Sequence, residues 1–142
     1  MYRLVIVEDE IVTRQGMERY FDWKRYGFEV VNAFPDGMEA LAWIKNNACD
    51  VVITDIMMSR LDGLELAARL RQTRPEIKVI ILSGYSTFDY AKQAIQNKVV
   101  EYLLKPIDPD EAAATLARVR AELDKQREKR APVMSRRVHR VM

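Results

Sequence analysis

Five short apolar runs, rich in β-branched residues, alternate with amphipathic stretches along this chain of 142 residues. The runs occupy residues 2–8, 28–33, 51–55, 78–82 and 101–104, and a helical pattern fills each gap. Repeated strand–helix units favour parallel strands, because each crossover helix returns the chain to the same end of the sheet. The pattern therefore predicts an α/β fold: a doubly wound five-stranded parallel sheet in the order 2-1-3-4-5, with five helices covering its two faces.

The predicted helices carry apolar faces and recognisable start signals. Apolar or small residues recur at helical spacing in three of them: Gly63, Leu66, Ala67 and Leu70; Phe88, Ala91, Ala94 and Ile95; Leu116, Val119 and Leu123. Asp36 with Glu39 forms a capping-box-like pair, and Asp108-Pro109 places a cap before a first-turn proline. Arg74-Pro75 is expected to end the helix that precedes it.

Charge divides the chain into an acidic body and a basic end. Residues 1–117 hold 14 Lys and Arg against 18 Asp and Glu, whereas residues 118–142 hold 9 against 3. Periodicity is lost after Ala131-Pro132, so we expect one domain over 1–125 and a basic linker or disordered tail over 126–142. No apolar run is long enough to span a bilayer and no signal-peptide pattern is present, so a cytoplasmic location is expected.

Residues able to do chemistry follow four of the predicted strands. Glu8 and Asp9 follow the first, Asp55 closes the third, Ser83 follows the fourth and Lys105 follows the fifth. The carboxyl ends of parallel strands are where such sheets place ligand sites, so these side chains should meet at one edge. Helix capping would explain each carboxylate alone, but not the lysine and the hydroxyl that face them.

An acidic cluster at that edge requires a cation. Carboxylates crowded together cannot all stay ionised cheaply unless a divalent ion balances them, and Mg²⁺ prefers such oxygens. One oxygen of Asp55 would then remain a nucleophile toward phosphorus, forming an aspartyl phosphate. Lys105 and the Ser83 hydroxyl would hold the new phosphoryl oxygens.

The chain resembles the receiver domain of two-component response regulators over about residues 1–125, a flavodoxin-like fold. The resemblance rests on Val5-Ile6-Val7-Glu8-Asp9-Glu10, Ile53-Thr54-Asp55-Ile56-Met57-Met58, Leu61-Asp62-Gly63, Ile81-Leu82-Ser83-Gly84 and Tyr102-Leu103-Leu104-Lys105-Pro106. A weaker similarity, through Phe21-Asp22-Trp23 and Ser83-Gly84-Tyr85-Ser86-Thr87-Phe88, is to receivers joined to AraC-type helix-turn-helix output domains.

The resemblance implies a role for each site residue. Asp55 accepts a phosphoryl group from a histidine kinase, and Lys105 contacts that group. The Lys105-Pro106 peptide bond is expected to be cis. Glu8, Asp9, Asp55 and the Met57 carbonyl bind Mg²⁺. Ser83 and Tyr102 form a switch pair that alters the face made by the fourth helix, fifth strand and fifth helix, and thereby controls an output such as transcription.

Residues near the acceptor suggest a slow reverse reaction. Met57 and Tyr85 stand two residues beyond Asp55 and Ser83, positions that border the path of hydrolytic water in the family. Bulky, largely apolar side chains cannot orient water by a strong hydrogen bond, so slow autodephosphorylation is expected. The protein is therefore expected to be a signalling switch and not a turnover enzyme.

The sequence leaves partners and alternatives open. His139, the only histidine, lies in the basic end, so a separate sensor histidine kinase or phosphotransfer protein must supply the phosphoryl group. A homodimer is possible, no membrane contact is expected, and DNA would be reached only through an output domain absent from this chain. One alternative is a phosphorylation-independent dimerisation or interaction module. A less favoured one is a Mg²⁺-dependent phosphohydrolase, which would usually need an acid where Met57 stands.

Overall fold

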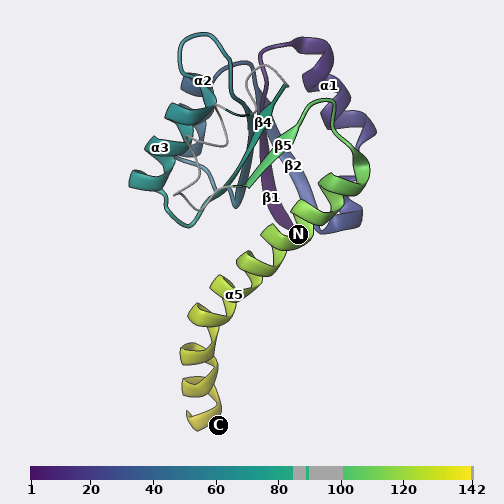
Figure 1. Cartoon of the computed structure of the whole chain (residues 1–142). Helices are drawn as coiled ribbons and strands as arrows, with labels where there is room; N and C mark the ends of the chain where they lie inside the picture. Colours follow the sequence, from purple (N-terminus) through teal and green to yellow (C-terminus); the bar gives the residue numbers. More distant parts are fainter. Residues whose placement is uncertain (85–88, 90–100, 142) are drawn as a thin grey trace.

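A five-stranded parallel sheet with helices on both faces forms the body of the molecule (Figure 1). The computed structural model describes residues 1–84, 89 and 101–141, and side chains as far as residue 129. The elements are, in chain order, β1 (Tyr2–Val7), α1 (Ile11–Tyr20), the 3₁₀ helix η1 (Trp23–Tyr26), β2 (Phe28–Phe34), α2 (Gly37–Ile44), β3 (Val51–Asp55), α3 (Gly63–Thr73), β4 (Lys78–Ser83), β5 (Glu101–Leu104) and α5 (Pro109–Val141).

The strand order β2-β1-β3-β4-β5 confirms the predicted doubly wound topology. All four strand pairs are parallel, and β1 lies between β2 and β3. Four α-helices occur in the described residues; the fifth one expected, over Phe88 to Ile95, falls outside them apart from the single residue Asp89. The order reverses between β1 and β3, which opens a crevice at the carboxyl ends of these two strands.

Alternating strand residues build two separate cores, one on each face of the sheet. On one face Val5, Val52 and Ile81 pack with α2 and α3, and on the other Ile6, Ile53 and Leu82 pack with α1, η1 and the first turns of α5. The predicted apolar faces are buried as expected in α3 (Leu66, Ala67, Leu70) and α5 (Leu116, Val119, Leu123). The central strands are therefore buried on both sides, as parallel strands require.

Helix starts follow the predicted capping chemistry. The Asp36 carboxylate accepts a hydrogen bond from the Glu39 amide at 2.9 Å, which caps α2. The Asp108 carboxylate accepts one from the Asp110 amide at 3.2 Å, and α5 begins at Pro109. α3 ends at Thr73, two residues before Pro75, as the Arg74-Pro75 pair predicts.

The carboxyl-terminal end differs from the sequence-based expectation. α5 continues through Val141 and extends away from the body of the molecule (Figure 1), whereas irregular chain was expected after Pro132. A boundary between a domain and a linker near residue 125 stays a prediction, since a helix can also serve as a linker. Among the described residues, no helix combines the length and apolar character that crossing a bilayer requires.

Candidate functional site

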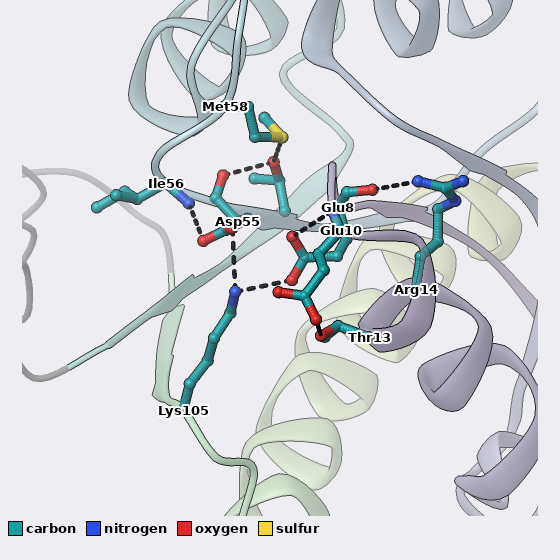
Figure 2. Close-up of polar contacts among 9 residues, drawn as sticks. Glu8, Glu10, Thr13, Arg14, Asp55, Ile56, Met58 and Lys105 are labelled. Carbon is teal, nitrogen blue, oxygen red and sulfur yellow. Dashed lines mark hydrogen bonds and ion pairs between the residues drawn. The ribbon is translucent and has the colours of Figure 1, made fainter.

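The predicted site residues lie at the carboxyl ends of four strands, at one edge of the sheet. Glu8 and Asp9 lie in the loop after β1, Asp55 and Ser83 are the last residues of β3 and β4, and Lys105 follows β5 directly. Figure 2 shows the side chains of Glu8, Asp55 and Lys105 converging between these strand ends. The topology therefore joins residues that are up to 97 positions apart in the sequence.

Lys105 bridges two of the carboxylates. Its Nζ lies 2.7 Å from Oε1 of Glu8 and 3.0 Å from Oδ2 of Asp55 (Figure 2). Partial burial favours the neutral amine, but the hydrogen bonds and charges of the two carboxylates raise the pKa of Lys105. The lysine is therefore an ammonium ion, and the Lys105-Pro106 peptide bond that follows is cis, as the resemblance implied.

The acidic residues are close enough to share one cation. One carboxylate oxygen from each of Glu8, Asp9 and Asp55 lies within 4.8 Å of the other two. The Glu8 side chain is only 1% exposed, while Asp9 is exposed to solvent. Burial raises the pKa of the Glu8 carboxyl to about 7, the ammonium of Lys105 opposes the rise, and the carboxylate of Asp55 adds to it. The single ammonium of Lys105 thus does not balance the negative charge of the three carboxylates.

The donor set fits a hard divalent ion. Three carboxylates that converge from the loop after β1 and the end of β3, with Asp9 exposed, match the oxygen ligands and partial hydration that Mg²⁺ prefers. A second positive charge would also favour the ionised form of the buried Glu8 carboxyl. Met57 follows Asp55 by two residues and is 64% exposed. Its carbonyl as a further ligand stays a prediction.

The backbone fixes the position of Asp55. Its Oδ1 accepts a hydrogen bond from the Ile56 amide at 2.8 Å, and its carbonyl accepts one from the Thr54 hydroxyl at 2.9 Å. Gly63, the first residue of α3, packs directly against the same carbonyl: a Cβ atom there would lie 2.1 Å from the Asp55 oxygen. The Asp55 side chain keeps 12% of its surface exposed, so an incoming group can reach its oxygens.

Ser83 lies on β4, the strand beside that of Asp55, and Tyr102 lies on β5, one strand further out. The Ser83 Oγ is buried and has no hydrogen-bond partner within the described part of the chain. Its carbonyl accepts a hydrogen bond from the Lys105 amide at 2.7 Å, which ties β4 to the loop after β5. Tyr102 is half-buried and packs against the core shared with α2 and α3. Tyr85, the other residue expected near the hydrolytic path, lies outside the described residues.

The structure adds two basic residues that sequence analysis missed. Arg14 on α1 donates a hydrogen bond to the Glu8 carbonyl at 2.7 Å (Figure 2) and so holds the loop after β1. Arg60, at a positive φ of 65°, pairs with Asp36 at 2.6 Å and ties the loop after β3 to the start of α2. Neither contact had a sequence signal: Arg14 reaches back from α1 to the loop that precedes it, and Arg60 joins loops 24 residues apart.

The family of response regulator receiver domains matches residues 4–117 of the chain. Among curated proteins, a response regulatory protein of Staphylococcus epidermidis is 42% identical over 108 residues, 76% of this chain and 42% of its own length. The transcriptional regulatory protein HptR of Staphylococcus aureus is 39% identical over 127 residues, 89% of this chain and 50% of its own length. The chain therefore spans half or less of the length of these relatives.

Solved structures give the same result. The receiver domain of AraT, a response regulator from Geobacillus stearothermophilus, superposes with a TM-score of 0.80 at 35% identity. A two-component transcriptional regulator AraC from Clostridium phytofermentans superposes with a TM-score of 0.81 at 33% identity. Each comparison covers 89% of this chain and 98% of the other. With the family match and the converging strand-end residues, the chain belongs to the response regulator receiver domains.

Proposed function

We propose that this domain is a Mg²⁺-dependent phosphoacceptor switch in which Asp55 takes a phosphoryl group from a phosphohistidine. The observation that carries the proposal is the convergence of Glu8, Asp55 and Lys105 within hydrogen-bond distance at one sheet edge. A capping aspartate would not need a buried glutamate and a lysine around it. A phosphoacceptor needs both, one to bind metal and one to hold the transferred group.

In the proposed reaction, an oxygen of Asp55 attacks the phosphorus of the phosphohistidine. The new P–O bond forms as the P–N bond breaks, and the imidazole nitrogen leaves with the electron pair and takes up a proton. Mg²⁺, held by Glu8, Asp9 and Asp55, would supply charge neutralisation at the transferred oxygens. Lys105 would move its ammonium from the Asp55 carboxylate to a phosphoryl oxygen, keeping its contact with Glu8.

Ser83 is proposed to relay the phosphorylated state. A buried hydroxyl without a partner costs about 1–3 kcal/mol, so a phosphoryl oxygen within its reach would relieve that cost. Because Ile81 of β4 pairs with Tyr102 of β5, a shift at the end of β4 can reach the aromatic ring through the ladder. This coupling supports the proposal that Ser83 and Tyr102 pass the signal to the face formed around β5 and α5.

The phosphoryl donor is proposed to be a histidine kinase or phosphotransfer protein that docks on α1. Ile11 and Val12 are 55% and 72% exposed at the start of α1, directly after the acidic loop. A hollow of about 560 Å³ beside them is lined by residues that include Tyr20, Lys105 and Ile107. Exposed apolar side chains at the mouth of a reactive site fit a protein partner that delivers its phosphohistidine there.

The docking surface can be tested apart from the chemistry. Val12→Asp is expected to slow transfer from a phosphorylated phosphotransfer protein while leaving phosphorylation by acetyl phosphate unchanged, because the small donor needs no docking surface. The control is Glu29→Gln, a substitution at an exposed position of β2. Equal slowing with both donors would show that Val12 acts on the site and not on docking.

The metal site has its own test. Tryptophan fluorescence of Trp23 and Trp43 is followed while Mg²⁺ and then beryllofluoride, a phosphoryl mimic, are added. We expect Asp9→Asn and Asp55→Asn to weaken the Mg²⁺ response at least tenfold, and the neighbouring Glu10→Gln to leave it nearly unchanged. Glu10 is a matched control because its carboxylate accepts from Thr13 and is not part of the cluster. An equal loss in all three variants would refute a specific metal site.

The fate of the acyl phosphate distinguishes the switch from an enzyme. The exposed Met57 offers no acid for a leaving group, so we expect one stoichiometric event and slow autodephosphorylation. Met57→Asn is expected to speed the decay, because an amide can orient water. Steady release of phosphate from phosphomonoesters would favour the phosphohydrolase alternative. Since the relatives are transcriptional regulatory proteins, control of transcription by a further domain is the proposed output.

A further inference from the structure

A polar hollow of about 320 Å³ lies at the edge of the sheet opposite the acidic site. Its wall combines the start of β1, the 3₁₀ helix η1 and one face of α5. Four cationic side chains line it, Lys24, Arg25, Arg120 and Arg127, against the single acidic residue Asp124. This cluster, called here the basic hollow, plays no part in the chemistry at Asp55.

The fold holds two of these cations in place without neutralising them. The guanidinium of Arg120 packs over Gly27, where a Cβ atom would lie 2.9 Å from its Nη1, so the missing side chain admits it. The guanidinium of Arg127 lies 5.2 Å from the centre of the Tyr2 ring. The same tyrosine donates its hydroxyl hydrogen bond to Asp124, which engages the only acid of the basic hollow.

The charge of the basic hollow is therefore available to a ligand. Within the ranges that the structure describes, none of its four cations forms an ion pair. Arg120 has one long hydrogen bond, 3.4 Å to the Tyr26 carbonyl, which leaves most of its donors unused. A guanidinium presents several N–H groups in a fork that matches phosphate oxygens.

Distance separates the basic hollow from the acidic site. β1 runs from Tyr2 to Val7, and at about 3.3 Å per residue the two sites stand roughly 17 Å apart along it. The Debye length at physiological ionic strength is about 8 Å, so the acidic cluster barely reduces the local positive potential. Residues 118–142, which form most of α5 and the end of the chain, hold 9 Lys and Arg against 3 Asp and Glu, so the chain beyond the basic hollow also carries a positive charge.

We propose that the basic hollow binds phosphate-type oxyanions. The excess of unpaired cations, the guanidinium forks and the polar wall all select a multiply charged oxyanion over a carboxylate ligand. Two sources carry this chemistry, the backbone of DNA and a free polyphosphate. DNA is the source favoured by the basic excess of residues 118–142, and that preference rests on the proposed role in transcription; the oxyanion site itself does not.

Two titrations of the whole chain test the proposal and separate the sources. Binding of a short fluorescent duplex of arbitrary sequence is followed by anisotropy at several salt concentrations, and binding of sodium tripolyphosphate by the amide resonance of Gly27. For Lys24→Gln/Arg120→Gln, we expect about tenfold weaker binding, at about threefold for each exposed cation. The salt slope for DNA should fall by about 1.8, since each lost phosphate contact removes about 0.9.

Matched variants guard against general charge and folding effects. Arg19→Gln/Arg71→Gln removes the same charge from exposed positions on α1 and α3 and should keep the wild-type affinity and slope. If Lys24→Gln/Arg120→Gln has a lower melting temperature than the wild type, Arg25→Gln/Arg127→Gln provides the second test.

The outcomes are distinct from those of the phosphoacceptor proposal. Loss of DNA binding in the hollow variants identifies the backbone as the source, and loss of tripolyphosphate binding alone identifies a free anion; either supports the site. Equal weakening in Arg19→Gln/Arg71→Gln, or no binding of either anion by the wild type, would overturn it. Asp55→Asn should bind both anions as the wild type does, so a failure at Asp55 leaves this result unaffected.

Discussion

Replacing Gly63 by alanine is expected to destabilise the domain, although alanine is the better helix former. Gly63 is the first residue of α3, and its amide donates a hydrogen bond to the Ile56 carbonyl at 2.9 Å. A Cβ atom at this position would lie 2.1 Å from the Asp55 carbonyl oxygen and 3.1 Å from the Ile56 Cα. Both neighbours are backbone, so the clash cannot be relieved by turning a side chain.

The magnitude follows from two opposing effects. Overpacking against a rigid neighbour costs about 3 kcal/mol at the upper end of the usual range. Alanine recovers at most about 1 kcal/mol over glycine in a helix. The net loss is about 2 kcal/mol, which at a urea m-value of about 2 kcal/mol/M lowers the unfolding midpoint by about 1 M. Because the clash displaces Asp55 itself, Mg²⁺ affinity should fall as well.

Gly16→Ala is the matched control for this experiment. Gly16 lies inside α1, and a Cβ atom there meets nothing within 4 Å. The same substitution should therefore stabilise the protein by up to about 1 kcal/mol, raising the urea midpoint by about 0.5 M. Opposite shifts are expected from equilibrium urea unfolding of the two variants. Shifts of the same sign, or Gly63→Ala as stable as the wild type, would refute the reasoning.

Two further predictions concern titrating side chains. Burial alone would raise the pKa of Asp36, but the Glu39 amide and the Arg60 guanidinium lower it. The ionised Asp36 carboxylate therefore stabilises the fold fully above the pKa of an unfolded aspartate, about 3.9, and this stabilisation is lost as the pH falls further. Asp36→Asn should lower the urea midpoint at neutral pH and flatten its acid dependence below about pH 4; an unchanged acid profile would contradict this. Burial raises the pKa of Cys49 to about 12, so a thiol reagent such as DTNB should not label it in the native state and should label it fully in denaturant, whereas rapid native labelling would contradict its burial.

Features with a local sequence signal were predictable. The strand pattern, with the rule that parallel strands share a carboxyl edge, predicts that Asp55 and Lys105 meet at one site. Helix caps such as Asp36 act within one turn, so residue type and spacing were sufficient to identify them. Buried helix faces such as Leu66 and Leu70 followed from periodicity, because the apolar side of a surface helix must face the core.

Contacts between distant loops could not be predicted in the same way. The pair of Arg60 with Asp36 joins residues 24 apart, and the hydrogen bond of Tyr2 to Asp124 joins residues 122 apart. Each requires the final placement of two separately formed elements, which no local pattern encodes. The basic hollow escaped prediction for the same reason. The helical continuation of α5 past Pro132 also ran against local propensity, since proline removes a backbone donor.

The central claim, that Asp55 accepts the phosphoryl group, is tested most directly by intact-protein mass spectrometry after incubation with acetyl phosphate. With Mg²⁺ the wild type should gain the mass of one phosphoryl group, and it should gain none with excess EDTA. Asp55→Asn should gain none in either case, whereas Asp62→Asn, which alters only the cap of α3, should behave as the wild type. Equal phosphorylation of Asp55→Asn, or a gain that persists without Mg²⁺, would contradict the account.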